Sequence, residues 1–198
     1  MKLVLATQNP KKLKEMNEIL SHLGVEVVSE AELGVRIEVE ETGETFTDNA
    51  RLKATAVMRA TGLPAVADDS GLCVDALNGG PGVYSARFGG EGLDDKGRYT
   101  LLLEMLRGQT DRAAHFHTSI VCAFPNGDEL VCEGERPGTI AFAPMGEGGF
   151  GYDPVFFVPE LRKTFGQLTA EEKASVSHRG KALRAFAAAL DDYLKGNE

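Results

Sequence analysis

The chain has 198 residues, of which 42% are hydrophobic and 26% charged, so it is long enough for one domain with a sizeable core and too apolar for disorder. No apolar run approaches the roughly 20 residues needed to cross a bilayer, and residues 1–6 turn polar too soon for a signal peptide, so we expect a cytoplasmic protein without a membrane partner. The net charge of −9 disfavours binding to a nucleic-acid backbone, so we expect no nucleic-acid partner.

The first predicted elements alternate between strand and helix. An apolar run over 3–6 predicts a buried strand, and Asn9 with Pro10 forms the signature of a helix start. The following apolar residues keep helical spacing until Gly24, and 25–28 predicts a second strand. This β-α-β opening favours a layered α/β fold.

The middle of the chain continues this alternation. A second helix is predicted over about 47–61, followed by a strand over 64–67 with the polar tetrapeptide 68–71 at its C-terminal end. A glycine-rich loop spans 79–90, and leucines and methionine over 101–106 predict a third helix.

The last third predicts a hairpin and a C-terminal helix. Strands over 116–124 and 129–142 are joined by the turn-forming residues 125–128. A further strand is predicted over 155–158, and Ser177 is placed to cap the last helix. The hairpin segment, about 113–142, is the candidate for a smaller lobe.

The first candidate site is the strand-to-helix junction over Thr7–Lys12. Backbone N–H groups and the positive end of a helix attract phosphate oxygens, and Thr7 and Asn9 add side-chain hydrogen bonds. Lys12 lies one turn into the helix, where it can contact the same anion. The spacing is not that of a Walker loop. The alternative is an ordinary capped helix with solvated lysines.

The second candidate site is a group of four carboxylates. Glu40 and Glu41 lie in an acidic segment, and Asp68 and Asp69 follow a predicted strand. Adjacent acids repel unless a positive group lies between them, and hard oxygen ligands beside a phosphate indicate Mg²⁺. Asp69 is placed to bind the metal, to orient a water, or to do both. The alternative is a solvated turn.

The third candidate is a glycine-flanked aromatic loop over Phe150–Asp153. An exposed aromatic ring in such a loop can stack on a base, and the neighbouring carboxylate can accept hydrogen bonds from a base edge. The alternative is a hydrophobic plug that leads into the next strand.

Further basic groups complete the candidate set. Lys53 lies four residues after Asn49 on one helix face, where it can neutralise phosphate charge. Lys173, His178 and Arg179 gather near the start of the last helix, where they can donate to a base carbonyl or cover the face of a base. The alternatives are a surface lysine and a charged helix start.

Five motifs occur in order along the chain. They are Thr7-x-Asn9-x-x-Lys12-x-x-Glu15, Asp68-Asp69-Ser70-Gly71-Leu72, Pro81-Gly82-x-Tyr84-Ser85-Ala86-Arg87, Gly149-Phe150-Gly151-Tyr152-Asp153-Pro154 and Ser177-His178-Arg179-Gly180. In this combination the sequence resembles the inosine triphosphate pyrophosphatase family, in particular its bacterial noncanonical purine NTP pyrophosphatases. The resemblance covers essentially the whole chain.

The resemblance implies a single ITPase-like domain over 1–198, built on a long mixed β-sheet with flanking helices and two lobes around a central active-site cleft. It implies a homodimer that hydrolyses XTP, ITP and dITP to the monophosphate and pyrophosphate with Mg²⁺. Such an enzyme removes deaminated purines from the nucleotide pool.

The resemblance also assigns roles to residues. Asp69 would be the catalytic proton acceptor, and Glu40 and Asp69 would hold Mg²⁺, with Glu41 as a neighbour. The substrate-binding residues would be Thr7, Gln8, Asn9, Pro10, Lys11, Lys12, Lys53, Ser70, Phe150, Gly151, Tyr152, Asp153, Lys173, His178 and Arg179.

The residue types explain how a base could be selected. Donors on His178 and Arg179 would pair with the 6-carbonyl of hypoxanthine or xanthine and would face another donor on adenine. Two other functions are compatible with the same residues: a purine nucleotide sensor that does not hydrolyse its ligand, and a pyrophosphatase for modified pyrimidine nucleotides.

Overall fold

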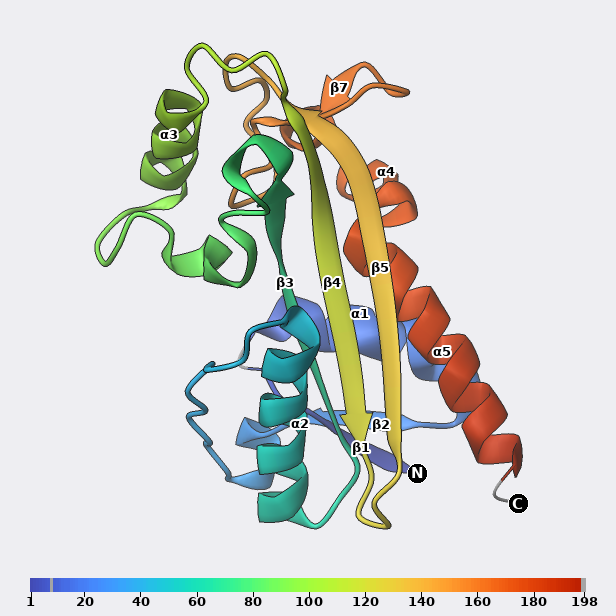
Figure 1. Ribbon diagram of the computed structural model, residues 1–198. Helices are drawn as coiled ribbons and strands as arrows, with labels where there is room; N and C mark the ends of the chain where they lie inside the picture. The colour runs from blue at the N-terminus through green and yellow to red at the C-terminus, as the bar shows by residue number, and fades with distance from the viewer. Residues whose placement is uncertain (8, 197–198) are drawn as a thin grey trace. The chain divides into compact units, whose positions relative to one another are not determined.

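The computed structural model describes residues 1–7 and 9–196, so the prediction for Gln8 lies outside the described residues. Seven strands form one sheet in the order β2-β1-β3-β4-β5-β6-β7 (Figure 1). The strands are β1 (Lys2–Leu5), β2 (Glu26–Ser29), β3 (Ala65–Val74), β4 (Ala113–Ala123), β5 (Glu129–Ile140), β6 (Phe156–Val158) and β7 (Lys163–Thr164). The helices are α1 (Pro10–Leu20), α2 (Phe46–Thr61), α3 (Asp95–Met105), α4 (Ala170–Val176) and α5 (His178–Gly196).

The direction of the strands makes the sheet mixed. β1 pairs in parallel with both β2 and β3, whereas β6 pairs antiparallel with β5 and β7. The β1-α1-β2 connection is the right-length crossover for a parallel pair. The prediction of an α/β fold with a mixed sheet and flanking helices is therefore confirmed.

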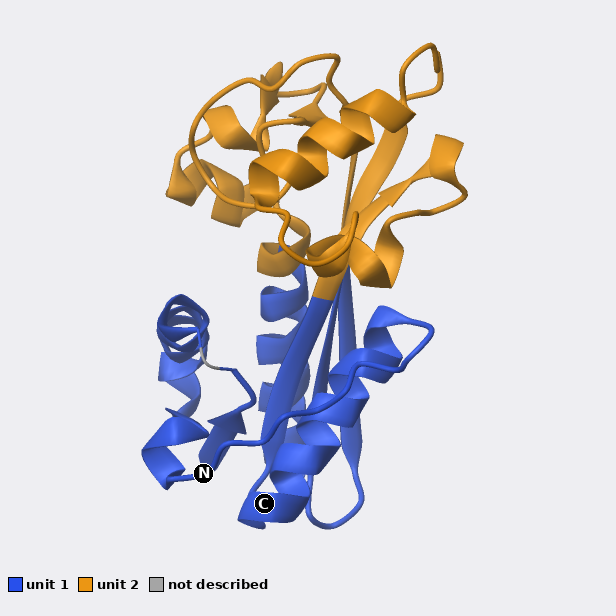
Figure 2. Cartoon of the chain, turned by 90° about the vertical axis from the view of Figure 1, so that its left-hand side faces the viewer, with its two compact units in different colours: residues 1–69, 118–134, 181–198 blue, residues 70–117, 135–180 orange. Residues whose placement is uncertain are grey.

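The chain divides into two compact units, which Figure 2 colours separately. Unit 1 comprises residues 1–69, 118–134 and 181–198, and unit 2 comprises residues 70–117 and 135–180. The segment around 113–142, expected to belong to a smaller lobe, is divided between both units. Its turn end belongs to unit 1 because Ile120, Cys122 and Cys132 are buried in the core of that unit.

Unit 1 packs helices on both faces of its strands. Alternate residues of a strand point to opposite faces, and in β1 Leu3 and Leu5 join the core that α1 and α5 cover, while Val4 joins the core under α2. Met16 of α1 and Phe186 of α5 are fully buried in the first of these cores. The strands are thus held rigidly from both sides.

Unit 2 has a separate core that is rich in aromatic rings. Phe116, Phe156 and Phe165 pack with ring centroids 4.6–5.8 Å apart. Arg112 is buried beside this core, where its guanidinium donates to the carbonyl groups of three residues, Leu106, Ile140 and Ala141. These bonds give the buried guanidinium the acceptors that it needs.

Most predicted boundaries are confirmed within a few residues, and the helix signals are confirmed in detail. Asn9 caps α1 by accepting a hydrogen bond from Lys11, and Gly62 ends α2 in the left-handed conformation. Ser177 accepts the N–H of Gly180 at the start of α5.

One boundary prediction is wrong. The tetrapeptide 68–71 does not follow a strand but lies inside β3, which continues to Val74. β3 lies between β1 and β4 in the sheet, and its pairing with β1 covers Ala65 and Val66, so the polar residues lie in the part of β3 beyond that pairing. The strand conformation also directs Asp68 and Asp69 to opposite faces, which removes the expected repulsion between neighbouring carboxylates.

No helix in the described part of the chain combines the length and hydropathy that crossing a membrane requires.

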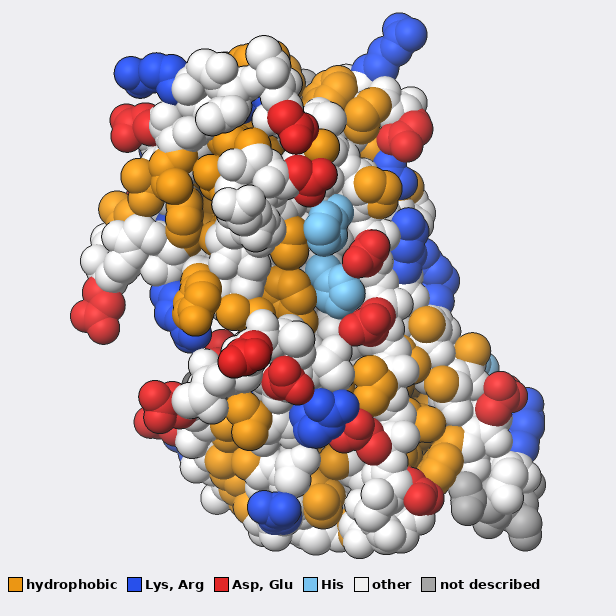
Figure 3. All heavy atoms as spheres, in the orientation of Figure 1, with side chains coloured by type: hydrophobic (Ala, Val, Ile, Leu, Met, Phe, Trp, Pro, Cys, Tyr) orange, Lys and Arg blue, Asp and Glu red, His pale blue; other side chains and the backbone are white. Residues whose placement is uncertain are grey.

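On the face drawn in Figure 3, basic and acidic side chains are interspersed over α2. Arg51 of α2 is an example, because it contacts both Asp48 and Glu129 at 2.9–3.3 Å.

Candidate active site

In unit 1, the junction between β1 and α1 is shaped by its own side chains. The Oγ1 atom of Thr7 accepts the N–H of Asn9 at 3.2 Å, and the Oδ1 atom of Asn9 accepts the N–H of Lys11 at 3.0 Å. Pro10 occupies the first turn, where its missing N–H costs nothing. Asn9, Pro10 and Lys11 are exposed, so the positive end of α1 is accessible to an anion.

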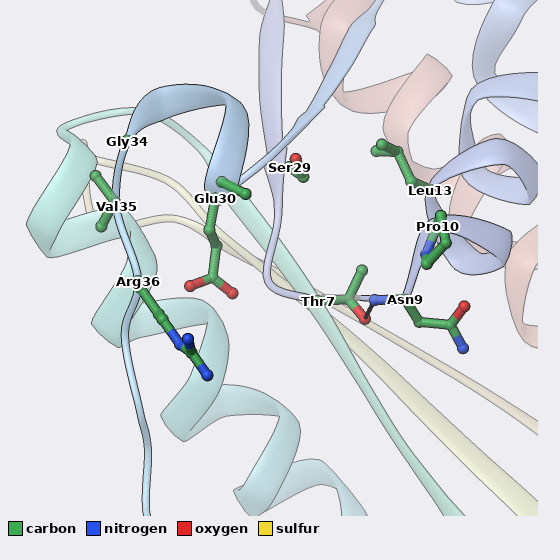
Figure 4. Close-up of a pocket in the computed structure, with 10 residues that line it drawn as sticks. Thr7, Asn9, Pro10, Leu13, Ser29, Glu30, Gly34, Val35 and Arg36 are labelled. Atoms are coloured by element: carbon green, nitrogen blue, oxygen red, sulfur yellow. Dashed lines mark hydrogen bonds between the residues drawn. The ribbon is translucent and has the colours of Figure 1, made fainter.

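A pocket of about 400 Å³ lies beside this junction (Figure 4). Thr7 and Asn9 line one side, and Glu30 and Arg36, from the segment after β2, line the other. Glu30 is buried and accepts the N–H of Ile37 at 3.2 Å, which fixes the course of this segment. The predicted phosphate-binding residues therefore border an open space within unit 1.

Each acid of β3 contacts its own lysine. Asp68 is buried on the α1 side, where its carboxylate lies 2.8 Å from the ammonium of Lys12. Asp69 faces α2, where its Oδ1 atom lies 3.5 Å from the Nζ atom of Lys53 and its Oδ2 atom accepts from Asn49 at 3.2 Å. The two predicted acids are thus brought to the two predicted lysines.

Helix α2 holds the second of these lysines in place. Asn49 is fully buried and uses both ends of its amide, because it donates to Asp69 and accepts the N–H of Gly43 at 2.8 Å. A side chain at position 43 would lie 2.7 Å from the Asn49 amide oxygen, so the close approach requires glycine. The predicted placement of Asn49 and Lys53 on one helix face is confirmed.

The charge of Lys53 is strongly stabilised by its neighbours. Burial acts against the ammonium and is the largest single influence, but the carboxylates of Asp69, Glu41 and Asp68 together outweigh it. The pKa of Lys53 is therefore raised above its usual value. Lys53 remains a cation at any physiological pH.

Glu41, rather than Glu40, contacts this cluster. The Oε1 atom of Glu41 lies 2.7 Å from the Nζ atom of Lys53, so Glu41 and Asp69 share one ammonium group. Glu40 is exposed, and among residues 1–7 and 9–196 its side chain makes no such contact with Lys53 or Asp69. Two hard carboxylate donors that converge in this way fit a divalent cation that is also held by phosphate oxygens.

In unit 2, the aromatic loop presents one ring to solvent. The side chain of Phe150 is 75% exposed, and the ammonium of Lys173 lies 4.4 Å from the centroid of its ring. Lys173 also contacts the buried carboxylate of Asp153 at 2.5 Å, and that carboxylate accepts the N–H of Phe150 at 2.9 Å. Phe150 has the exposure that stacking on a base requires.

Asp153 and Tyr152 are structural members of this loop in the present conformation. Asp153 is 2% exposed, and burial raises the pKa of its carboxyl more than Lys173 and the Phe150 amide lower it. Tyr152 is also buried, and its hydroxyl donates to the carbonyl of Ser85 at 2.8 Å. A side chain at Gly149 would overlap the Asp153 carboxylate, which explains the glycine there.

His178 lies against the aromatic core of unit 2. Its ring is nearly parallel to that of Phe116, with centroids 4.6 Å apart and an interplanar angle of 11°. The ring of Phe165 is parallel to that of Phe116, with an interplanar angle of 1°. The ammonium of Lys173 lies 5.4 Å from the centroid of the Phe165 ring. The aromatic residues therefore orient two of the predicted base-binding side chains, while Arg179 beside them is partly buried.

The structure divides the predicted site residues between the units. Those of unit 1 are Thr7, Asn9, Pro10, Lys11, Lys12, Glu40, Lys53 and Asp69, and those of unit 2 are Ser70, Phe150, Gly151, Tyr152, Asp153, Lys173, His178 and Arg179. Ser70 is exposed on β3 directly after Asp69.

Sequence reasoning missed the residues that support this set. Ser85 and Phe116 contact Tyr152 and His178 from segments more than 60 residues away, and Asp95 contacts Gly151 from 56 residues away. Ser85 lies in a recognised motif, but no local pattern assigns it a partner. Asp95 and Phe116 carry no signal of this kind, because their contacts depend on tertiary packing.

Comparisons with known proteins identify relatives over nearly the whole chain. A family model described as the Ham1 family matches residues 3–189. A dITP/XTP pyrophosphatase of Exiguobacterium sp. is 50% identical over 196 residues, which cover 99% of this chain and 100% of that protein.

Solved structures are similar over the same range. The Ham1 protein of Staphylococcus aureus has a TM-score of 0.91 at 41% identity and covers 100% of both chains. A HAM1 protein from Coxiella burnetii has a TM-score of 0.93 at 43% identity and covers 97% of this chain and 99% of that one.

Proposed function

Because this chain belongs to the Ham1 family, we propose that it hydrolyses the noncanonical purine nucleoside triphosphates XTP, ITP and dITP to the monophosphate and pyrophosphate. It is thus a nucleoside triphosphate pyrophosphatase that removes deaminated purines from the nucleotide pool. The observation that carries the proposed chemistry is the cluster in unit 1 in which Asp69, Glu41 and Lys53 meet within 3.5 Å.

Unit 1 supplies groups for the triphosphate. Lys12 and Lys53 are cations that neutralise the charge developing on the leaving pyrophosphate. Each of them now contacts a carboxylate at 2.7–2.8 Å, so phosphate oxygens would replace or share these carboxylate partners. Thr7, Asn9 and the positive end of α1 offer further hydrogen bonds to phosphate oxygens.

Asp69 and Glu41 are the members of this cluster proposed to hold a divalent cation, and Glu40, the neighbour of Glu41 in the sequence, is proposed from the sequence alone. We assign the cation as Mg²⁺ because these donors are carboxylate oxygens. When bound, Mg²⁺ would neutralise phosphate charge and polarise the phosphoryl oxygens. Asn49 donates a hydrogen bond to the Oδ2 atom of Asp69, which fixes the orientation of this carboxylate oxygen. That oxygen can accept the proton of the water that attacks the α-phosphorus.

Unit 2 supplies groups for the base. Phe150 offers an exposed ring for stacking, and His178 is held by Phe116 in one orientation. Donors on His178 and Arg179 would pair with a 6-carbonyl and would face the 6-amino group of adenine without an acceptor. Asp153 and Tyr152 contribute by shaping the loop.

The decisive experiment measures pyrophosphate release from ITP, XTP, ATP and GTP in the presence of Mg²⁺. We expect kcat/KM for ITP and XTP to exceed that for ATP by a factor of about 10² or more, since a mismatched polar contact is costly. Phosphorus NMR of the products would give monophosphate and pyrophosphate. Equal rates on all four substrates would contradict the proposed selectivity, and an intact triphosphate would indicate a sensor instead.

The homodimer and the cytoplasmic location belong to the same proposal. Sedimentation of the purified protein and fractionation of the cells that produce it would check them.

A further inference from the structure

The loop that carries Phe150 is held from outside by one carboxylate of helix α3. The Oδ2 atom of Asp95 accepts the N–H of Gly151 at 2.7 Å, although the two residues are 56 positions apart in the sequence. Asp95 lies in the first turn of α3, directly after the Asp94 cap. Arg98, one turn later, lies 3.4 Å from the other oxygen of Asp95 and fixes its orientation.

This contact matters because two glycines flank the exposed ring in the loop. Phe150 is flanked by Gly149 and Gly151, which have φ angles of 77° and 60° and so lie in the left-handed region. Glycine has more conformational freedom than any other residue, and this freedom must be lost when the loop is ordered. The ring is 75% exposed and buries little surface, although the ammonium of Lys173 lies 4.4 Å from its centroid.

Two consecutive amides of the loop are each bound by a carboxylate. The N–H of Phe150 is bound by Asp153, which belongs to the loop itself, and the N–H of Gly151 is bound by Asp95, which belongs to α3. Hydrogen bonds to a charged acceptor are stronger than neutral ones. The loop is therefore fixed on one side of Phe150 by its own carboxylate and on the other side by a separate element.

We propose that Asp95 is a positioning residue for base recognition, which acts by holding the Gly151 amide so that the Phe150 ring is ready to stack on the purine. This inference rests on the proposed function for its effect on catalysis, but the positioning itself is independent of any substrate. Asp95 also lies close enough to raise the pKa of both Asp153 and Tyr152, which agrees with its place beside the loop.

The first test needs no substrate. The chain contains no tryptophan, so Phe150→Trp introduces a single tryptophan, whose fluorescence can be excited separately from that of the four tyrosines. We expect Asp95→Ala in this background to increase the fast local component of the fluorescence anisotropy decay. An unchanged decay would overturn the proposal, whatever the enzyme hydrolyses.

The second test uses kinetics with ITP. We expect Asp95→Ala to raise KM three- to tenfold with kcat changed less than twofold, because the loss affects base binding and not the reacting phosphate. Asp95→Asn retains an oxygen acceptor and should stay within twofold of the wild-type KM. Glu104→Ala removes an exposed carboxylate from the same helix and should leave KM unchanged. A KM that is unchanged in Asp95→Ala, or raised equally in Glu104→Ala, would overturn the proposal.

A double-mutant cycle separates positioning from a general loss of stability. If Asp95 acts through Phe150, Asp95→Ala should have no further effect on KM in a Phe150→Ala background. Independent, multiplicative effects of the two substitutions would overturn the proposal. If the wild-type protein releases no pyrophosphate from ITP, the proposed function fails, and the anisotropy experiment still decides the role of Asp95.

Discussion

Both units contain a close lysine–aspartate pair, but the pairs have different surroundings. In unit 1, Lys53 contacts Asp69 and Glu41, which belong to β3 and to the segment before α2. In unit 2, Lys173 contacts Asp153, whose carboxylate also accepts a backbone N–H of its own loop. The carboxylate of Asp69 is held by side chains. The carboxylate of Asp153 also accepts a backbone hydrogen bond within its own loop.

This difference indicates what each pair can do. A pair that is held by side chains can exchange partners with a metal ion or a phosphate, because such contacts break without altering the fold. A carboxylate that closes a loop cannot leave without releasing that loop, because the backbone amide that it accepts from would lose its partner. We infer that the unit 1 pair takes part in chemistry and that the unit 2 pair maintains the shape of a binding surface.

The largest expected effect concerns Asp69. Asp69→Asn keeps the shape of the side chain but removes the charge and the ability to accept a proton, so kcat for ITP should fall by about 10³. KM should change less than about fivefold, because the lysines and the base-binding residues remain. Initial rates of pyrophosphate release measure both constants.

The control for this substitution is Asp75→Asn, which alters an exposed acid in the turn after β3. It should leave kcat within a factor of about two of the wild-type value. A kcat for Asp69→Asn near that of the wild type would remove Asp69 from catalysis and with it the contrast between the two units.

A smaller effect is expected from the aromatic loop, and it should be confined to the base. Phe150→Ala should lower kcat/KM for ITP by a factor of about 10, since stacking of one base contributes about 1–3 kcal/mol. Inorganic tripolyphosphate has no base, so its inhibition constant should be unchanged in Phe150→Ala.

Lys12→Ala provides the matched comparison for this experiment, because it removes a cation from unit 1. It should raise the inhibition constant of tripolyphosphate by a factor of about 10. If Phe150→Ala weakened tripolyphosphate inhibition as much as Lys12→Ala does, the proposed division of roles between the units would be incorrect.

The smallest expected effect is on stability at alkaline pH. The pKa of Lys53 is raised in the folded state, so its stabilising contribution is fully present below the unfolded pKa of about 10.4 and is lost as the pH rises through the folded pKa. Lys53→Met should therefore lower the free energy of unfolding by about 1 kcal/mol at pH 8, and this difference from the wild type should shrink as the pH rises through the raised pKa of Lys53.

Urea unfolding at several pH values measures this difference directly. Lys14→Met is a suitable control, because the Lys14 side chain is 78% exposed and should give a difference from wild type that is near zero at each pH. A difference for Lys53→Met that stayed constant or grew with pH would show that the Lys53 contacts do not stabilise the fold.

Local patterns of residues were enough to predict the secondary-structure elements and the reactive groups. The Asn9–Pro10 helix start, the Gly62 stop and the turn over 125–128 depend on residues a few positions apart, so local physical chemistry was sufficient to predict them. The placement of Asn49 and Lys53 on one helix face was predictable because residues four positions apart are neighbours on a helix surface. The assignment of substrate class required the ordered motifs over the whole chain.

How these groups are paired depends on contacts between segments that are distant in the chain. The continuation of β3 through Asp68 and Asp69 directs their side chains to opposite faces, each toward a different lysine. The course of the segment before α2 brought Glu41 to Lys53, and packing of α3 brought Asp95 to Gly151. Such contacts join residues that are distant in sequence. The geometry of the contacts is fixed by burial and strand pairing, and no local pattern of residues specifies that geometry.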